Sequence, residues 1–277
     1  MATKAIHLEL VTSLSKNDCI FAIQRFAGRR GVPQKLLSDN GRNFIGARND
    51  LTQIQSLFNA QAENSQTSII PYLNSQAIEW EFIPPHSPHF GGIWEAAVKS
   101  MKRHMRRVIG LQVLFYEELL TILIRIEATL NSRPLYPLSD DPNDPRPLTP
   151  AHFLVGGSMK TPPGADLEIT ANARLKLVNK IHQDFWKRWK RNYLIMLQIR
   201  AKWHQDGPEY RKGDLVLLAE DNEAPMQWKT GRIIDVFPGN DGIIRVAKVK
   251  TSSSELIRPI VKLRRLPVET EPSGIRN

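Results

Sequence analysis

The sequence predicts an α/β region followed by a small all-β region, and three observations lead to this prediction. Short apolar stretches alternate with longer amphipathic ones up to residue 131, which is typical of strands alternating with helices. From residue 210 the period changes, and short apolar stretches follow one another with turns between them. The length of 277 residues suits about two domains, each long enough to bury a core.

The first region is expected to hold its elements in the order strand, helix, strand, helix, strand, helix, helix. The stretch AIHLELV at residues 5–11 alternates large apolar side chains, as a strand does. Asn17 and Asp18 can cap the helix that follows, which runs to about Gly28. The remaining elements are strands at 35–39 and 77–84 and helices at 47–58, 93–108 and 113–131. They form an α/β layer with a thin sheet of three strands.

A Pro-rich connection at 131–150 and an irregular stretch at 151–171 separate this region from the next. An aromatic, basic helix is expected at about 172–204. Turns at PGNDG and TSSSE separate four short strands of a small β-barrel at 214–219, 231–237, 243–249 and 260–266. The predicted organisation is a first domain, a linker, a basic C-terminal domain and a disordered tail, at 1–157, 158–171, 172–267 and 268–277.

The charge is unevenly distributed along the chain. Of 38 Lys and Arg and 28 Asp and Glu, residues 1–171 hold 17 basic and 16 acidic side chains, and residues 172–277 hold 21 and 12. Nearly all of the net charge of +10 therefore lies in the C-terminal part. A basic module joined to a nearly neutral one suggests a polyanionic partner such as nucleic acid, although a solvated basic surface has the same composition.

Other features exclude several classes of protein. No apolar run reaches the roughly 18 residues of a membrane span, so we expect no membrane partner. The first residues lack the apolar block of a signal peptide. The single cysteine, Cys19, excludes an internal disulfide and a Cys-based zinc site within these residues, and a reduced intracellular compartment is expected.

Asp39 stands at the end of a predicted strand and is followed by Asn40 and Gly41. A carboxylate in that place lies at the rim of the sheet, where open α/β sheets bind ligands. The alternative is structural, because an Asp-Asn-Gly sequence also forms a turn that caps the next helix. The residues alone leave both interpretations open.

The helix predicted at 93–108 divides its side chains between two faces. One face carries a single acid and then only bases, namely Glu95, Lys99, Lys102, Arg103 and Arg106. The opposite face is apolar and carries Trp94, Val98, Met101, Met105 and Val108. The charged face suits a metal ion at one end and phosphates along the rest. A solvated face with a Glu–Lys pair four residues apart is the common alternative.

A pair of histidines gives only a weak metal-site signal. His86 and His89 lie in the Pro-rich loop before Glu95, but two histidines lack the other ligands that zinc needs.

The predicted helix at 172–204 repeats aromatic residues at helical spacing with cations between them. We interpret the aromatic residues as a core stripe, with a basic exterior that can still face DNA. The cations of the β-barrel would contact phosphates rather than bases, and a protein partner is the lesser alternative.

Two ordered runs, SDNGRNF at 38–44 and WEFIPPHSPHFGGIWEAAVKSMKRHMRR at 80–107, resemble the catalytic core of retroelement integrases. The similarity is greatest to the integrase part of BEL/Pao-type LTR retrotransposon polyproteins and covers residues 2–157. Supporting stretches are ATKAIHLELV, FAGRRGVP, LNSRPL and LTPAHFLVG, at 2–11, 26–33, 130–135 and 148–156. Residues 172–267 resemble the domain that follows this core in the same elements, and GDLVLL and WKTGRI in it resemble the start of an SH3- or chromo-like barrel.

The resemblance implies a ribonuclease H-like core and metal-dependent strand transfer of DNA. Members of this family hold two Mg²⁺ or Mn²⁺ ions with an Asp, Asp, Glu set, and one metal activates the attacking oxygen while the other stabilises the leaving oxygen. Asp39 matches the second Asp and Glu95 the Glu, with the polar stretch at 59–77 accounting for their wide separation. Lys99 and Lys102 match positions that contact DNA, and Arg103 and Arg106 extend that face.

The family's first Asp lies on a strand that precedes AIHLELV, and the sequence has no residue in that place. The zinc-binding module of the family is also absent, so Met1 resembles an internal methionine of a longer polyprotein. We therefore expect no strand transfer by this chain alone, and poor folding of its core. The alternatives are a non-catalytic DNA-binding protein and an inert product of a truncated element. The resemblance further implies a homo-oligomer when intact, with DNA as partner, acting in the nucleus.

Overall fold

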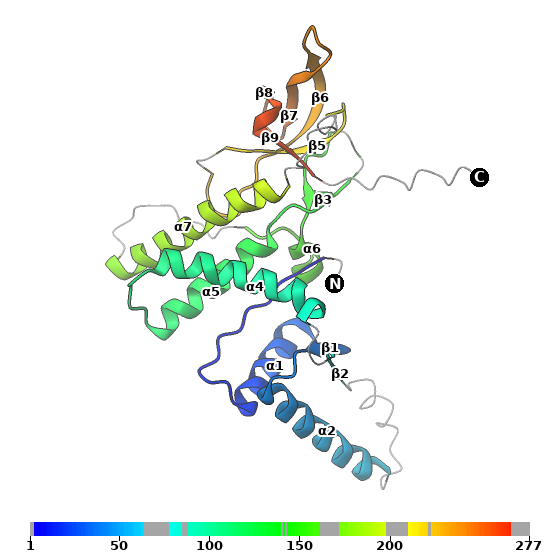
Figure 1. The fold of residues 1–277 in the computed structure, drawn as a ribbon, viewed down its shortest axis with the longest axis vertical. Coiled ribbons are helices and arrows are strands. Elements are labelled where there is room, and N and C mark those ends of the chain that lie inside the picture. Colours follow the sequence, from blue (N-terminus) through cyan, green and yellow to red (C-terminus); the bar gives the residue numbers. More distant parts are fainter. Residues whose placement is uncertain are drawn as a thin grey trace, which may run out of the picture. The chain divides into compact units, whose positions relative to one another are not determined.

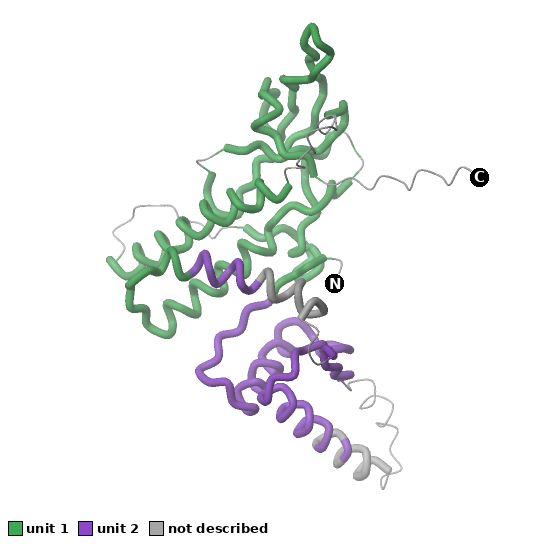
Figure 2. Tube along the Cα trace, viewed as in Figure 1, with its two compact units in different colours: residues 1–6, 106–277 green, residues 7–105 purple. Residues whose placement is uncertain are grey.

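The computed structural model describes residues 3–63, 78–84, 88–139, 141, 143–160, 172–197, 210–220 and 223–266, apart from the side chains of 54, 55, 57–63 and 88–97. The chain combines helices and strands in two compact units (Figures 1 and 2). One unit comprises residues 7–105, and the other comprises residues 1–6 and 106–277. In the described part of the chain, no helix is long and apolar enough to cross a membrane.

The unit of residues 7–105 begins with helix α1 (Lys16–Arg30). Its cap is Ser15, whose Oγ accepts a hydrogen bond from the backbone N–H of Asp18 at 3.1 Å. The cap predicted at Asn17 and Asp18 was therefore wrong, because both residues lie inside the first turn. The carboxylate of Asp18 instead accepts a hydrogen bond from Ser15 Oγ at 2.7 Å. Ser15 and Asp18 are thus joined by two hydrogen bonds across the first turn of the helix.

Two parallel strands joined by a long helix form the rest of the described βαβ arrangement. Strand β1 (Lys35–Ser38) pairs in register with β2 (Glu79–Phe82), and α2 (Arg42–Glu63) connects them. Helix α2 packs on α1, and the buried residues between helices and strands are Cys19, Ala47 and Trp80. This core is small, because the sheet has two strands among the described residues rather than the three predicted.

The missing strand is the stretch at 5–11, which forms no strand in the structure. Residues from His7 onward place side chains against α1 instead. The His7 ring packs edge-on to Phe26 with 5.0 Å between ring centroids, and Glu9 forms ion pairs with Arg25 and Arg29. Alternating apolar residues make a strand only when another strand supplies backbone partners, and the described residues place none beside this stretch.

Helices α4 (Pro88–Ile109) and α5 (Tyr116–Asn131) follow. Helix α4 begins a few residues earlier than predicted, and α5 begins a few residues later. In the unit of residues 1–6 and 106–277, α5 lies against α7 (Ala173–Met196). Arg125 Nη1 donates to Asn179 Oδ1 at 2.7 Å, and Thr129 Oγ1 lies 2.9 Å from His182 Nε2. Burial lowers the pKa of His182 to about 4, so the ring packs in its neutral form.

The LNSRPL stretch at the end of α5 connects distant parts of this unit. Asn131 exchanges two hydrogen bonds with the backbone of Ile6, at 2.9 and 2.7 Å. The buried guanidinium of Arg133 donates to the carbonyls of Leu130 and Lys4, at 2.6 and 2.5 Å. Tyr193 on α7 donates from its hydroxyl to the carbonyl of Pro134. The LNSRPL stretch thus supplies hydrogen-bond partners for backbone groups of Lys4 and Ile6, which are not paired in a strand.

The Pro-rich connection contains a short hairpin of β3 (Tyr136–Pro137) and β4 (Pro147–Leu148), followed by α6 (Pro150–Val155). None of the three was predicted. Thr149 and His152 form a reciprocal cap at the start of α6, and Gly156 ends that helix with φ of 74°.

The C-terminal sheet is antiparallel with five strands in the order β8-β7-β6-β5-β9. Its elements are β5 (Leu215–Leu218), β6 (Thr230–Pro238), β7 (Ile244–Thr251), β8 (Glu255–Pro259), the 3₁₀ turn η1 (Ile260–Lys262) and β9 (Leu263–Arg265). The single strand predicted at 260–266 was wrong in its first half. Pro259 ends β8 because it has no N–H to continue the ladder, and the chain turns through η1 before β9.

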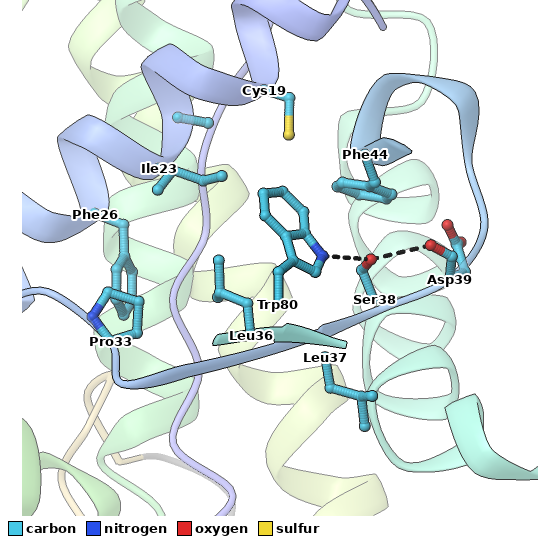
Figure 3. Close-up of a pocket in the computed structure, with 11 residues that line it drawn as sticks. Cys19, Ile23, Phe26, Pro33, Leu36, Leu37, Ser38, Asp39, Phe44 and Trp80 are labelled. Carbon is cyan, nitrogen blue, oxygen red and sulfur yellow. Dashed lines mark hydrogen bonds between the residues drawn. The ribbon is translucent and has the colours of Figure 1, made fainter. Parts of the chain in front are cut away.

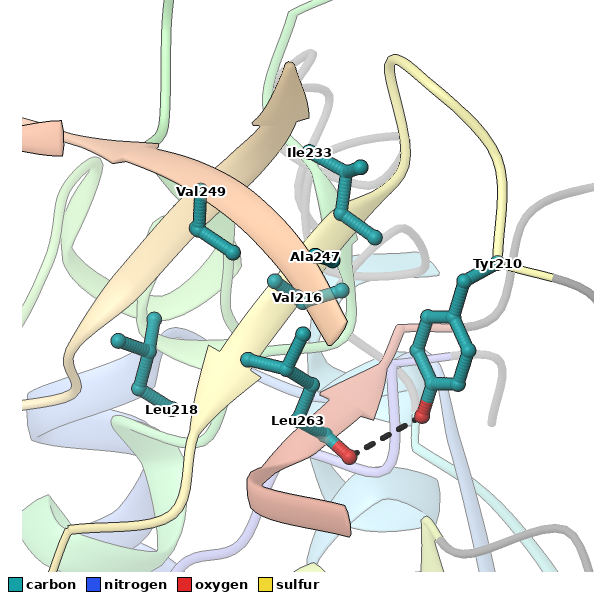
Figure 4. Packing of buried hydrophobic residues seen from close by; sticks show 7 residues of the cluster. All are labelled: Tyr210, Val216, Leu218, Ile233, Ala247, Val249 and Leu263. Atoms are coloured by element: carbon teal, nitrogen blue, oxygen red, sulfur yellow. Dashed lines mark hydrogen bonds between the residues drawn. The ribbon is translucent and has the colours of Figure 1, made fainter. Parts of the chain in front are cut away.

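Two buried clusters stabilise this unit. Apolar side chains of β5, β6, β7 and β9 pack together, and Tyr210 joins the cluster by donating its hydroxyl to the carbonyl of Leu263 at 3.1 Å (Figure 4). A second cluster joins three aromatic residues of α7, Trp186, Trp189 and Tyr193, to Trp228 in edge-on contacts of 4.9 to 5.9 Å between centroids. The predicted aromatic core stripe is therefore confirmed.

Candidate metal and nucleic-acid site

Asp39 lies immediately after β1, in a tight turn that leads into α2. Its Oδ1 accepts a hydrogen bond from the backbone N–H of Gly41 at 2.9 Å. A Cβ at Gly41 would lie 3.0 Å from that oxygen and 2.8 Å from Oδ1 of Asn43, so a larger residue there would push both side chains out of their present positions. The structural interpretation of the Asp-Asn-Gly sequence as a turn is thus confirmed, and the ligand interpretation stays a prediction.

The turn also joins the carboxyl ends of the two parallel strands. Asn40 Nδ2 donates to the carbonyl of Ile83, just past β2, at 2.9 Å. Behind the turn, Trp80 Nε1 donates to Ser38 Oγ at 2.9 Å. The exposed carboxylate of Asp39 therefore lies at the carboxyl end of the sheet, where these hydrogen bonds hold the turn in place. Parallel strands bind ligands at this end.

An apolar pocket of about 420 Å³ adjoins Asp39 (Figure 3). Side chains of α1 and β1 line it, and Trp80 stands between them. Leu36 points toward α1 and Leu37 points away, yet both line the pocket. Besides the Asp39 carboxylate at its rim, the described lining has the Ser38 hydroxyl, which accepts from Trp80, and the Cys19 thiol, and the other side chains are apolar. One carboxylate is too few hard oxygen ligands for a metal ion in the interior.

Glu95, the other predicted catalytic and metal-binding residue, belongs to α4, but its side chain lies outside the described part of the structure. The side chains of His86 and His89 also lie outside it. Within the described part of the chain, no three His, Cys, Asp or Glu side chains gather in a way that could hold a metal ion. Asp39 fits Mg²⁺ or Mn²⁺ as a single hard oxygen ligand with one oxygen engaged by Gly41. The predicted pairing of Asp39 with Glu95 stays a prediction.

The basic face predicted on α4 is exposed. Lys99, Lys102, Arg103 and Arg106 all have exposed side chains, and none has a hydrogen bond or ion pair to another described residue. Met101 and His104 on the other side of the helix are buried. Val98 was expected on that apolar side but is exposed. The helix thus presents four exposed cations along one face, none paired with another described side chain, at a spacing that can follow a line of phosphates.

Comparisons with known proteins give a family match for part of the chain and a structural match that covers most of it. A family model described as a family of unknown function, DUF5641, matches residues 173–266. This range lies within residues 172–267, which the sequence analysis assigned to a basic C-terminal domain. No curated protein matches the sequence.

Among solved structures, the chain is similar to a chain in the cryo-electron microscopy structure of a simian T-cell lymphotropic virus intasome in complex with PP2A regulatory subunit B56 gamma. The TM-score is 0.29 and the sequence identity is 12%. The alignment covers 92% of this chain and 66% of that chain.

Proposed function

We propose that this chain is the nucleic-acid-binding part of an integrase-type polynucleotidyl transferase that acts on phosphodiester bonds of DNA. The observation that carries the proposal is the exposed basic face of α4, where Lys99, Lys102, Arg103 and Arg106 lie free of described partners. Lysine and arginine in such a row bind the phosphate backbone and give little base specificity. The excess charge of +9 in residues 172–277 adds to the attraction for DNA.

Asp39 supports the catalytic side of the proposal. Its carboxylate is exposed at the carboxyl end of β1, and the bond from Gly41 holds it in one orientation. In the proposed site, Asp39 and Glu95 would hold Mg²⁺ or Mn²⁺ together with oxygens of the DNA phosphate. The ion would offset the charge that develops on that phosphate during transfer. An RNase H-like core of the BEL/Pao type is the fold that this proposal assumes for the intact site.

The proposal separates binding from catalysis for the chain of 277 residues. The chain has residues that match two of the three catalytic carboxylates of the integrase family. We therefore expect the chain to bind DNA without joining strands. Strand transfer in the presence of Mn²⁺, lost on Glu95→Ala, would contradict that expectation. Acting on chromosomal DNA would require entry to the nucleus, and joining two DNA ends would require more than one copy of the protein.

The test is the affinity for a labelled duplex, measured by fluorescence anisotropy. A variant with Lys99, Lys102, Arg103 and Arg106 all changed to Gln should bind at least tenfold more weakly than the unsubstituted chain. The control changes four other exposed lysines, Lys160, Lys176, Lys180 and Lys212, to Gln, which removes the same charge. Equal weakening in the two variants would mean that α4 has no special part in binding.

A further inference from the structure

The apolar pocket beside Asp39 lies within the unit of residues 7–105, and we call it the α1–β1 pocket (Figure 3). Its volume of about 420 Å³ falls in the range of about 300 to 1,000 Å³ that is usual for pockets that bind small molecules. Helix α1 and strand β1 form two of its sides, and Phe44 and Trp80 add aromatic rings. The pocket is therefore large enough for a molecule with one or two rings.

The walls of the α1–β1 pocket keep apolar surface that the core does not cover. Ile23, Leu36 and Phe44 pack on the buried cluster around Trp80, yet all three are only half-buried. Phe26 on α1 also lines the pocket and is half-buried. A ligand with an apolar body would remove this surface from water, which is the main source of affinity in pockets of this kind.

Asp39 makes the rim of the pocket negative. It is the one charged side chain among the described lining residues, and no described cation pairs with it. The backbone N–H of Gly41 engages Oδ1 at 2.9 Å, which leaves Oδ2 without a described partner. A carboxylate with no counter-charge beside an apolar wall favours a ligand that carries a positive charge and disfavours an anion.

The backbone of Leu37 adds a second acceptor at the open edge of β1. The carbonyls of Gln34 and Ser38 accept from β2 and the residue after it, at 2.9 Å each. Alternate residues of a parallel strand bond to the same neighbour, so Leu37 directs its N–H and C=O to the other edge. The described residues pair no strand with that edge, and Leu37 lines the pocket. Its carbonyl is therefore available to a ligand.

The Ser38 hydroxyl, by contrast, is already engaged. It accepts from Trp80 Nε1 at 2.9 Å and donates to the carbonyl of Asp39 at 3.0 Å. The polar groups left for a ligand are thus mainly acceptors, namely the Leu37 carbonyl and Oδ2 of Asp39. An ammonium group carries three N–H donors and a positive charge, so it matches both acceptors and the sign of the rim.

We propose that the α1–β1 pocket binds a small hydrophobic amine. Its apolar body would lie against Phe26, Leu36 and Trp80, and its ammonium group would meet the carboxylate of Asp39 and the carbonyl of Leu37. The inference does not depend on the proposed function, because it requires no DNA. If Asp39 also binds a divalent metal ion, the ammonium and the metal would compete for the same carboxylate.

The probes are naphthylmethylamine and naphthylacetate, which share a ring system and carry opposite charges. Each is titrated into the full chain in buffer with EDTA, so that no divalent ion competes for Asp39, and binding is followed by ligand-observed NMR. A second readout reports the place of binding. Cys19 lines the pocket and is the one cysteine of the sequence, so the rate of its alkylation by iodoacetamide is specific to this site.

Two pairs of variants test the two parts of the site, after circular dichroism confirms that each folds. Asp39→Asn removes the rim charge, and its control, Asp50→Asn, removes the same charge from a residue that does not line the pocket. Ala22→Phe places a ring in the pocket. Its control, Gln24→Phe, places the same ring on the exposed side of α1. If Ala22→Phe does not fold, the Asp39 pair still decides the outcome.

The amine should bind at least about fivefold more tightly than the acid, and saturating amine should slow the alkylation of Cys19 about fivefold. Asp39→Asn should weaken amine binding about fivefold, whereas Asp50→Asn should change it less than about twofold. Ala22→Phe should weaken binding of the amine at least about tenfold, because its ring takes the volume of the ligand, and Gln24→Phe should leave binding unchanged.

Three results would overturn the inference. Equal affinity for the amine and the acid would mean that the rim charge selects nothing. Equal effects of Asp39→Asn and Asp50→Asn, or amine binding that leaves the alkylation of Cys19 unchanged, would place the amine elsewhere on the protein. Failure of both probes to bind would mean that the pocket takes no ligand of this class, and the DNA-binding proposal for α4 would be unaffected.

Discussion

Asn40 donates a hydrogen bond from Nδ2 to the carbonyl of Ile83 at 2.9 Å, and this bond joins the carboxyl ends of β1 and β2. Asp39, one residue earlier, accepts from the backbone N–H of Gly41 at 2.9 Å. The position of the candidate metal ligand is therefore set by a three-residue turn that is itself fixed to the neighbouring strand. The turn and the candidate ligand are one structural unit.

Replacing Gly41 should disturb that unit. In Gly41→Ala the new Cβ would press on Oδ1 of Asp39 and of Asn43, so we expect a decrease of about 1 kcal/mol in the free energy of unfolding. The matched control is Gly28→Ala, because Gly28 is helical and nothing lies within 4 Å of its added Cβ. That change should stabilise the protein by about 0.5 kcal/mol or more. Urea denaturation measures both, and a stable Gly41→Ala would contradict the account.

Removing the Asp39 carboxylate should abolish the response to divalent metal. If Asp39 helps to bind Mg²⁺, addition of MgCl₂ at constant ionic strength should raise the Tm of the unsubstituted chain, because a ligand of the native state stabilises it. Asp39→Asn should lose this increase. Asp50→Asn should keep it, since Asp50 is engaged in an exposed pair with Lys16 at 2.9 Å. An equal increase in all three proteins would show that the metal binds elsewhere.

The bond between Trp228 Nε1 and Ser132 Oγ, 3.1 Å long, should couple the end of α5 to the segment before β6. Trp228→Phe removes the donor and keeps a ring in the aromatic cluster, and Ser132→Ala removes the acceptor. A double-mutant cycle from denaturant unfolding should give a coupling energy of about 1 kcal/mol. A coupling near zero would mean that aromatic packing alone holds these segments together.

His182 should make stability depend on pH. Burial lowers its pKa to about 4 in the folded state, against 6.5 in the unfolded chain. The unfolded chain therefore binds more protons between these values, so the stabilisation is fully present above pH 6.5 and is lost as the pH falls toward 4. The decrease between pH 7 and pH 5 should be about 2 kcal/mol in the free energy of unfolding.

The control for this prediction is His182→Gln, which cannot titrate in that range. The urea midpoint of the variant should vary less between pH 7 and pH 5 than that of the unsubstituted chain. The same pH dependence in both proteins would assign the effect to other groups.

Periodicity alone predicted most of the regular elements. Helices α1, α5 and α7 were expected from their apolar stripes, and β1 and β2 from short apolar stretches bounded by turns. The buried position of Trp186, Trp189 and Tyr193 followed from their spacing. The exposed face of Lys99, Lys102, Arg103 and Arg106 followed in the same way, because helical geometry is local.

Features that depend on distant residues were not predicted. The stretch at 5–11 has the alternation of a strand, but whether it forms one depends on a neighbour that its own residues do not encode. The bond from Asn40 to Ile83 spans 43 positions, and a pocket between α7 and η1 is lined by segments that are far apart in the sequence. Only Pro259 offered a local signal that was missed, since proline ends a strand and predicts the break before η1.

The measurement that tests the central claim most directly is the affinity of the full chain for duplex DNA across a salt series. If the four α4 cations bind phosphates, log Kd should rise linearly with log salt at a slope of about 0.9 for each phosphate neutralised. Between about 50 and about 200 mM salt, affinity should then fall by about a hundredfold or more. No binding at low salt, or binding that salt does not weaken, would contradict the account.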